Sequence, residues 1–196
     1  MKFEDVINGR HSVRKFREKK VPKTIIKKLI ANGVKAPSAC NRQPWIFYCV
    51  DSKKKRDEVS ELLNNIYSKL RADKGIKSNR IRKVADEFYE DMGGAQNIIF
   101  VFRKAGKNDP AYVKPNDIAS ISCAVENIML SAVEMKLGTC WIGTFGGDAS
   151  VKKLRKILGN KKDEELVSAF TIGYPHKKFK KLKRSKKKVS EVLKFI

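Results

Sequence analysis

Apolar positions recur at helical spacing in some stretches of the chain and run continuously in others. From about 116 to 136 they recur every three or four residues, which predicts a strongly apolar and therefore central helix. Four shorter runs combine continuous apolar content with β-branched and aromatic residues, which is typical of buried strands. The predicted strands are 45–50, 97–102, 138–143 and 166–174, and the other predicted helices are 3–9, 22–36, 53–72, 82–92 and 149–158.

The predicted helices and strands alternate along the chain, with no internal repeat and no change in composition that would divide it. This order predicts a single domain, 1–196, in which helices cover a sheet, and the pattern alone leaves α/β and α+β open. The segment 73–81 reads as a mobile connection. The basic tail, 176–196, ends in apolar residues whose spacing suggests that the tail packs on something, such as another subunit: Val189, Val192 and Leu193.

Composition narrows the class of protein further. The chain has 196 residues, 41% of them hydrophobic, so it is globular and long enough to bury a core. It has no apolar run near the roughly 20 residues of a membrane span and no secretory signal, so we expect a cytoplasmic protein that does not bind membranes. Lys and Arg number 44 against 21 Asp and Glu, a net charge of +23. That charge favours anionic partners, or else a solvated basic surface.

Four cysteines and two histidines are too few, and too widely spaced, to predict a metal site. No pair of cysteines has C-x-x-C spacing. We expect reduced thiols in or near the core, with Cys40 as the first candidate for an exception. The cysteines are Cys40, Cys49, Cys123 and Cys140.

The usual catalytic motifs are missing from the sequence. It contains no G-x-S-x-G, no H-E-x-x-H, no P-loop and no G-x-G-x-x-G, and its only histidines are His11 and His176. When catalytic side chains are scarce, a bound cofactor can carry the reaction. No side chain is therefore predicted to be catalytic.

Three segments have the chemistry to hold a cofactor. Residues 10–14 combine two arginines with a hydroxyl, which suits a phosphate, although from spacing alone a basic surface turn is the plainer explanation. The proline-bounded loop 37–44 lets backbone amides approach a planar ligand, or simply connects a helix to a strand. Glycines in 141–147 mark either the close approach of a ligand or a plain turn. The basic run 177–188 reads as a solvated tail that could add a phosphate contact.

In this order, the segments resemble the nitroreductase family of FMN-dependent oxidoreductases. The likeness spans essentially the whole chain. It implies an α+β sandwich whose mostly antiparallel sheet is flanked by helices, and a homodimer with exchanged tails that builds two FMN sites from both subunits. The strings that carry it are R-H-S-V-R-K-F at 10–16, A-P-S-A-C-N-R-Q-P-W at 36–45, L-G-T-C-W-I-G at 137–143 and I-G-Y-P at 172–175.

The resemblance also implies a reaction and a set of contacts. NADH or NADPH would reduce FMN at N5, and a nitroaromatic, a quinone or a related small acceptor would then take the electrons in a ping-pong mechanism. Arg14 would lie near the pyrimidine edge of the flavin and stabilise charge at N1/O2. The other implied contacts are Arg10, His11 and Ser12 with the phosphate and ribityl chain, Trp141, Ile142 and Gly143 beside the ring, Pro37, Ser38, Ala39 and Asn41 from the partner subunit, and Arg184 or else Lys186 on the phosphate.

Two features depart from this picture. The region 64–82, which in relatives often shapes the mouth of the substrate site, shows no matching pattern, and the charge of +23 exceeds what one FMN requires. Another flavin enzyme on the same scaffold, dehalogenase-like or flavin-modifying, is the first alternative. A basic nucleic-acid-binding module ranks below it, because the aromatic rows expected for single-strand binding are not evident.

Overall fold

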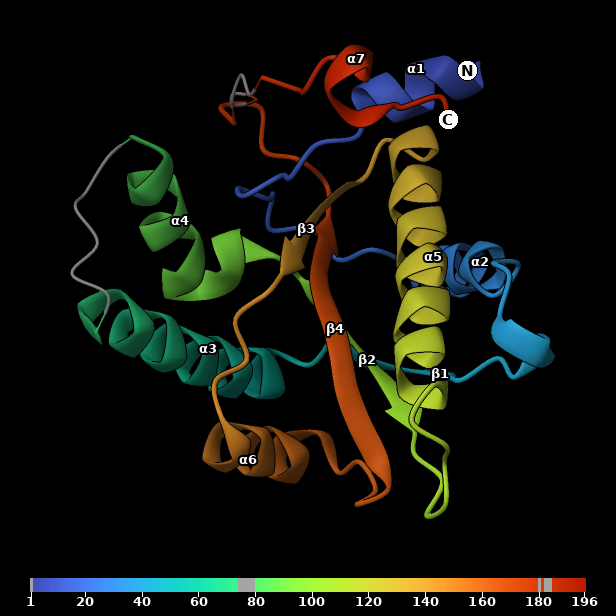
Figure 1. Ribbon diagram of the computed structural model, residues 1–196. Coiled ribbons are helices and arrows are strands. Elements are labelled where there is room, and N and C mark those ends of the chain that lie inside the picture. Colours follow the sequence, from blue (N-terminus) through green and yellow to red (C-terminus); the bar gives the residue numbers. More distant parts are fainter. Residues whose placement is uncertain (1, 74–79, 180, 182–184) are drawn as a thin grey trace.

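A computed structural model describes residues 2–73, 80–179, 181 and 185–196 (Figure 1). Every helix and strand expected from the apolar pattern is present, with ends shifted by up to three residues, whereas most of the expected connection 73–81 falls outside the described residues. The helices are α1 (Phe3–Gly9), α2 (Lys23–Gly33), α3 (Lys53–Asp73), α4 (Arg80–Asp91), α5 (Val113–Glu134), α6 (Asp148–Leu158) and α7 (Val189–Val192), and two 3-10 turns are η1 (Ala39–Asn41) and η2 (Met92–Gly94). The strands are β1 (Trp45–Val50), β2 (Asn97–Lys104), β3 (Gly138–Ile142) and β4 (Glu164–Gly173).

The four strands form one sheet in the order β1-β2-β4-β3, and each neighbouring pair is antiparallel. Antiparallel pairing in a sheet covered by helices defines an α+β fold, which settles the class that the pattern alone left open. At the outer edge of β3, Ser12 makes a parallel bridge with Thr139, so the segment after α1 covers part of that edge.

Helices cover both faces of the sheet and bury a separate apolar cluster on each. Figure 1 shows α3, α4 and α6 on one side of β4, with α2 and α5 on the other. Residues of β2 alternate between the two clusters: Ile98 and Phe100 pack with the first group of helices, whereas Ile99 and Val101 pack with the second. This alternation follows from the pleat of a strand, and burial on both faces explains why β2 is apolar throughout.

The helix α5 contacts the sheet and α2 at close range. Its residues Ile121, Val125 and Ile128 are fully buried. A Cβ added at Gly33, the last residue of α2, would lie 2.6 Å from the Cγ1 of Ile128, so the two helices can approach this closely only because position 33 has no side chain. The predicted central position of the long apolar helix is confirmed.

Two expectations about burial were wrong. The strand β1 was expected to be buried, but it lies at an edge of the sheet and is mostly half-buried. An apolar run predicts a strand but does not reveal how many strands flank it. Only Cys140 is buried, whereas Cys49 and Cys123 are exposed together with Cys40. Cys49 lies on the edge strand, and Cys123 lies on the face of α5 that turns away from the sheet, so neither side chain reaches the core.

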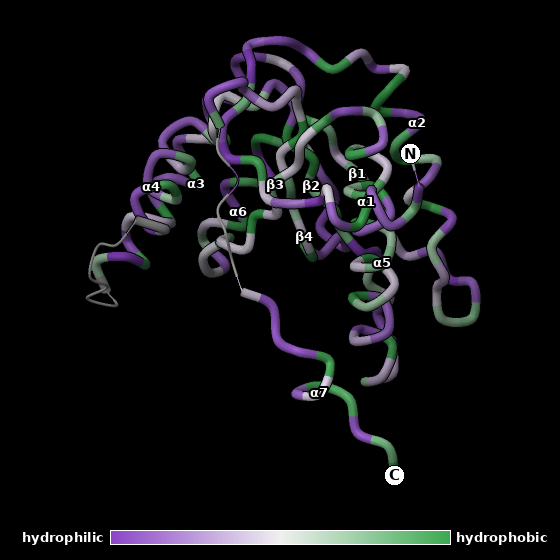
Figure 2. The backbone as a smooth tube through the Cα atoms, turned by 90° about the horizontal axis from the view of Figure 1, so that it is seen from above, coloured by the Kyte–Doolittle hydropathy of each residue, from purple (hydrophilic) through white to green (hydrophobic). Residues whose placement is uncertain are grey.

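The end of the chain extends away from the body of the molecule. Figure 2 shows α7 and the residues after it as an arm on which hydrophobic positions recur. Val192 is 64% exposed and Phe195 is 91% exposed, and two apolar residues of α1 are exposed as well, Phe3 at 70% and Ile7 at 49%. The apolar residues of the tail, which predicted that it packs on something, are therefore not covered by the described residues of their own chain. Among the described residues, no helix is both long enough and apolar enough to span a membrane.

Candidate functional site

The segment 10–16 is fixed between β3 and η2 by backbone hydrogen bonds. The N–H of Val13 donates to the carbonyl of Thr139 (2.9 Å), and the N–H of Phe16 donates to the carbonyl of Gly93 (2.8 Å). Both of these side chains are buried, which anchors the segment. Gly93 has a φ of +65°, and a Cβ there would lie 2.4 Å from the carbonyl oxygen of Arg14, so only glycine fits at this position.

The polar side chains of this segment differ in how they are engaged. Arg10 lies 3.5 Å from Glu126 of α5, and the Nδ1 of His11 lies 2.7 Å from the carbonyl oxygen of Gly9. The side chains of Ser12 and Arg14 are half-buried and make no hydrogen bond or ion pair with the other residues that the structure describes. These two side chains therefore hold donors that are available to a ligand.

Arg14 lies close enough to Tyr89 of α4 to interact with it electrostatically, and no sequence motif pointed to this tyrosine. Burial raises the pKa of Tyr89, while a hydrogen bond with Thr144 and the positive charge of Arg14 act against that shift. The ring of Tyr89 stacks on Tyr67 at 4.1 Å with an angle of 7° between the planes. Helical spacing in α4 could not reveal these contacts, because they join α4 to the end of β3 and to the N-terminal segment.

The end of β3 combines an exposed aromatic with open space. Trp141 is 41% exposed and Ile142 is fully buried, as alternation along a strand requires. A Cβ added at Gly143 would meet no atom within 4 Å, and its φ is not positive. Neither backbone conformation nor packing within the chain explains the glycine, so a ligand or a partner that approaches this point is a physical reason for it.

The loop 37–43 lies elsewhere along α5. The N–H of Ala39 donates to the Oγ of Ser120 (3.4 Å), whereas Arg10 contacts α5 at Glu126. Six residues of helix separate these points, about 9 Å at a rise of ~1.5 Å per residue. Pro37 and Asn41 are exposed and Ser38 and Ala39 are half-buried. The loop and the segment 10–14 therefore attach to α5 at different points, and the assignment of the loop to the partner's site stays a prediction.

The basic tail passes near α1. The Nζ of Lys181 donates to the carbonyl of Asn8 (3.1 Å), and the ring of Phe179 lies parallel to that of His11, 6.1 Å between centroids. The start of the tail thus lies beside the predicted phosphate-binding segment. Lys186 is exposed, and Arg184 lies outside the described residues, so the expected phosphate contact from the tail stays a prediction.

An open cavity of about 600 Å³ lies between α3 and α4, and most of its lining belongs to the region 64–82, in which no family pattern was found. Tyr67 donates its hydroxyl proton to Asp86 (2.8 Å), and Arg71 forms an ion pair with the same carboxylate (2.8 Å). Burial, with the hydrogen bond to Asp86 as a second cause, raises the pKa of Tyr67 to about 12. Tyr67 lines this cavity and stacks on Tyr89, which interacts with Thr144 and Arg14. The cavity and the segment 10–14 are therefore linked through this pair of tyrosines.

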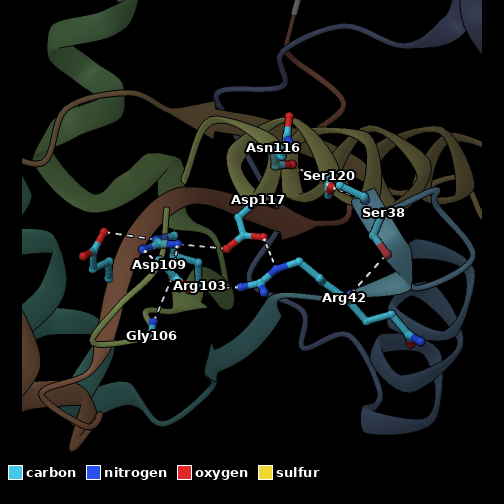
Figure 3. Close-up of polar contacts among 11 residues, drawn as sticks. Ser38, Arg42, Arg103, Gly106, Asp109, Asn116, Asp117 and Ser120 are labelled. Carbon is cyan, nitrogen blue, oxygen red and sulfur yellow. Dashed lines mark hydrogen bonds and ion pairs between the residues drawn. The ribbon is translucent and has the colours of Figure 1, made fainter. Parts of the chain in front are cut away.

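A network of ion pairs connects the loop 37–43 to the sheet (Figure 3). The Nη1 of Arg103 lies 2.8 Å from one carboxylate oxygen of Asp117, and the Nε of Arg42 donates to the other at 3.2 Å. The hydrogen bond with Asp117 raises the pKa of Arg42, and the backbone N–H of Gly106 is the main cause that lowers the pKa of Asp109. No sequence pattern predicts this network, because its members come from a loop, a strand and a helix.

Comparison with known proteins identifies the fold family. The model of the Nitroreductase family matches residues 7–174, and the chain therefore belongs to the nitroreductase family. A protein of Archaeoglobus fulgidus named "Putative NADH dehydrogenase/NAD(P)H nitroreductase" is 27% identical over 173 residues, which is 87% of this chain and 83% of that protein. Iodotyrosine deiodinase of Hydra vulgaris is 25% identical over 95% of this chain and 70% of its own.

Two solved structures resemble the fold over its full length. A BluB-like flavoprotein from Clostridium difficile 630 superposes with a TM-score of 0.79 at 26% identity and covers 100% of this chain and 99% of its own. A nitroreductase with bound FMN from Bacteroides fragilis gives a TM-score of 0.74 at 20% identity, again over 100% and 99% of the two chains, a likeness that concerns the fold alone. The α+β sandwich implied by the sequence resemblance is confirmed.

Proposed function

We propose that this protein is an FMN-dependent NAD(P)H oxidoreductase that reduces a small acceptor such as a nitroaromatic or a quinone. The observation that carries the proposal is a pair of half-buried donors, Ser12 and Arg14, which make no hydrogen bond or ion pair with the other described residues. They lie on the segment that pairs with the outer edge of β3 through Ser12 and Thr139, and the same strand runs on to the open position Gly143. A cation and a hydroxyl without partners suit an anionic, hydrogen-bonding ligand. Membership of the nitroreductase family and the similarity to the NAD(P)H nitroreductase of Archaeoglobus fulgidus support FMN as that ligand.

The residues present fit FMN in their chemistry. Arg14 would face the electron-poor end of the ring and hold negative charge there, while the backbone of Trp141–Gly143 would lie beside the ring. Bound FMN would supply the redox chemistry, by accepting a hydride from NADH or NADPH and passing electrons to the acceptor. The phosphate and ribityl chain would contact Arg10, His11 and Ser12, with Arg184 or Lys186 from the tail.

A second copy of the chain completes the site in this proposal. The loop with Pro37, Ser38, Ala39 and Asn41 would come from the partner subunit, as the family resemblance implies; within one chain the loop and the segment 10–14 contact α5 at different points, Ser120 and Glu126. The exposed apolar residues of the tail, Val192 and Phe195 among them, support exchange of tails between the subunits. Exposed apolar patches of this kind commonly mark protein–protein interfaces. One nitroreductase-like domain per chain, 1–196, and a cytoplasmic location stay predictions.

The visible spectrum of the purified protein tests the proposal. We expect flavin absorbance after reconstitution with FMN, and bleaching of that absorbance when NADH or NADPH is added without oxygen. A protein that stays colourless in excess FMN would overturn the proposal. Deletion of residues 189–196 should shift the protein from dimer to monomer in sedimentation velocity and lower FMN uptake with it, while an unchanged dimer would refute the exchange of tails.

Reductive dehalogenation is a second candidate reaction on the same site. The similarity to iodotyrosine deiodinase over 95% of this chain supports it. The two functions share FMN and differ in the acceptor, so a panel of nitroaromatics, quinones and halogenated phenols offered to the reduced protein separates them. Fast reoxidation by the halogenated phenols alone, with release of halide, would favour the second function.

A further inference from the structure

The loop 38–43 has a backbone conformation that its sequence does not favour. Cys40, Asn41 and Gln43 have φ values of 50°, 54° and 47°, in the left-handed region, and none of them is glycine. Each such residue carries a conformational cost, which persists only when the surroundings determine the shape. Three in four consecutive residues therefore require contacts that hold this loop.

Part of the holding lies within the loop itself. The Oγ of Ser38 accepts a hydrogen bond from the N–H of Gln43 (3.1 Å), and its carbonyl accepts one from the N–H of Asn41 (3.0 Å). These bonds close the turn but leave it free to move as a unit. Contacts with another element must therefore fix its place.

That element is the N-terminal half of α5. Asp117 and Ser120 lie three residues apart, so they share one face of the helix. The loop meets this face at two points with the same spacing, since the N–H of Ala39 donates to Ser120 and the Nε of Arg42 donates to Asp117. Ser120 is oriented in turn, because its hydroxyl donates to the carbonyl of Asn116 at 2.7 Å (Figure 3).

Asp117 is held from behind independently of the loop. Its side chain is 1% exposed and that of Arg103 is 4% exposed, and the two form an ion pair at 2.8 Å. Arg103 also contacts Glu165 through its Nε (3.1 Å) and Asp109 through its Nη1 (3.3 Å). The pair does not depend on Arg42 for its own contact, so we expect it to remain when Arg42 is replaced. Asp117, in contrast, cannot be changed cleanly, because its loss would leave Arg103 with less compensation in the interior.

We propose that Arg42 is a positioning residue that, through Asp117, fixes the 38–43 loop in the shape that presents Asn41 to the flavin of the partner subunit. The proposal rests on the function proposed above. Arg42 itself points its guanidinium at Asp117 and Asp109 of its own chain, so its charge is neutralised there and its contribution to the cofactor is the shape of the loop.

The test compares two variants that each remove one positive charge from the same network. Arg42→Gln removes the ion pair that joins the loop to Asp117 of α5. Lys114→Gln removes an exposed ion pair with Glu165 that does not involve the loop. In the apoprotein, amide exchange at Ala39 and Gln43 should accelerate about tenfold in Arg42→Gln and stay unchanged in Lys114→Gln. The dissociation constant for FMN should rise roughly tenfold in Arg42→Gln alone, with a changed near-ultraviolet dichroism of the bound flavin.

The two measurements separate failure of this inference from failure of the proposed function. Faster exchange with unchanged FMN affinity and dichroism would overturn the role of Arg42 in positioning toward the flavin. Unchanged exchange in Arg42→Gln would overturn the claim that it holds the loop. If the unmodified protein itself takes up no FMN, the proposed function fails and the flavin part of this inference fails with it, while the exchange rates still decide whether Arg42 holds the loop.

Discussion

Two arginines of the predicted cofactor-binding segments, Arg14 and Arg42, behave in opposite ways. Arg14 is half-buried and makes no ion pair with the other residues that the structure describes, whereas Arg42 donates to Asp117 and lies 3.6 Å from Asp109. A guanidinium without partners supplies charge to a ligand, and one that is already neutralised supplies the shape of its loop. Both come from strings that resemble one family, so the motif alone does not tell these two roles apart.

The largest effect that this contrast predicts is on Arg14. Replacing it with alanine removes a cation near the position where negative charge develops on the flavin, so we expect roughly a hundredfold slower reduction of FMN by NAD(P)H in stopped-flow measurements. The melting temperature of the apoprotein should hardly change, since the side chain contacts no ionic partner among the described residues. Lys15→Ala, an exposed neighbour with the same charge, serves as the control. An unchanged reduction rate with a lowered melting temperature would assign Arg14 to the fold instead.

The next effect concerns the glycines of β3 and of the residues that follow it. Gly143→Ala adds a methyl group that meets no atom of the described residues within 4 Å, so stability should be preserved while FMN affinity, measured by fluorescence titration, falls about tenfold. Gly138→Ala is the matched opposite: its Cβ would lie 2.6 Å from the Cγ2 of Val13, and we expect a loss of about 1–3 kcal/mol in the free energy of unfolding. Preserved FMN affinity in Gly143→Ala would mean that the ring does not lie against this point.

A smaller effect is expected at Ser12. Its hydroxyl has no hydrogen bond with the other described residues, so Ser12→Ala should leave the melting temperature of the apoprotein unchanged. It should weaken FMN binding by one hydrogen bond, about 1 kcal/mol or roughly fivefold in the dissociation constant. Equilibrium dialysis with FMN measures this change. A drop in apoprotein stability with normal FMN affinity would place the hydroxyl in the fold and not in the site.

The smallest effect concerns acid and the network around Arg42. The hydrogen bond from Lys114 is the main cause that lowers the pKa of Glu165 below its ordinary value of 4.5, and the N–H of Gly106 does the same for Asp109 below 3.8. Carboxyls with a lowered pKa in the folded protein stabilise it above those ordinary values, and the contribution is lost as the pH falls through the folded pKa. The melting temperature should therefore decline below about pH 4.5, and less steeply in Glu165→Gln.

Glu134→Gln is the control for this pH dependence, since it removes an exposed carboxyl at the end of α5. Thermal melts between pH 7 and pH 3 make the comparison. Equal slopes in all three proteins would mean that Glu165 does not contribute to acid sensitivity.

The sequence by itself determined the elements and the family. Apolar spacing located every strand and every helix except the short α7, because a helix buries one face and a buried strand must be apolar on both sides. The strings at 10–16, 36–45 and 137–143 carried the resemblance to the nitroreductase family, and the match of the family model to residues 7–174 confirmed it.

Only the tertiary structure decided the order of the strands, the edge position of β1, the exposure of Cys49 and Cys123, and the partners of Arg42. These properties depend on which elements become neighbours. The contact between Arg42 and Asp117 joins residues 75 positions apart, and a local pattern carries no information about such a pair. The difference between a free and a neutralised arginine is therefore a property of the folded molecule.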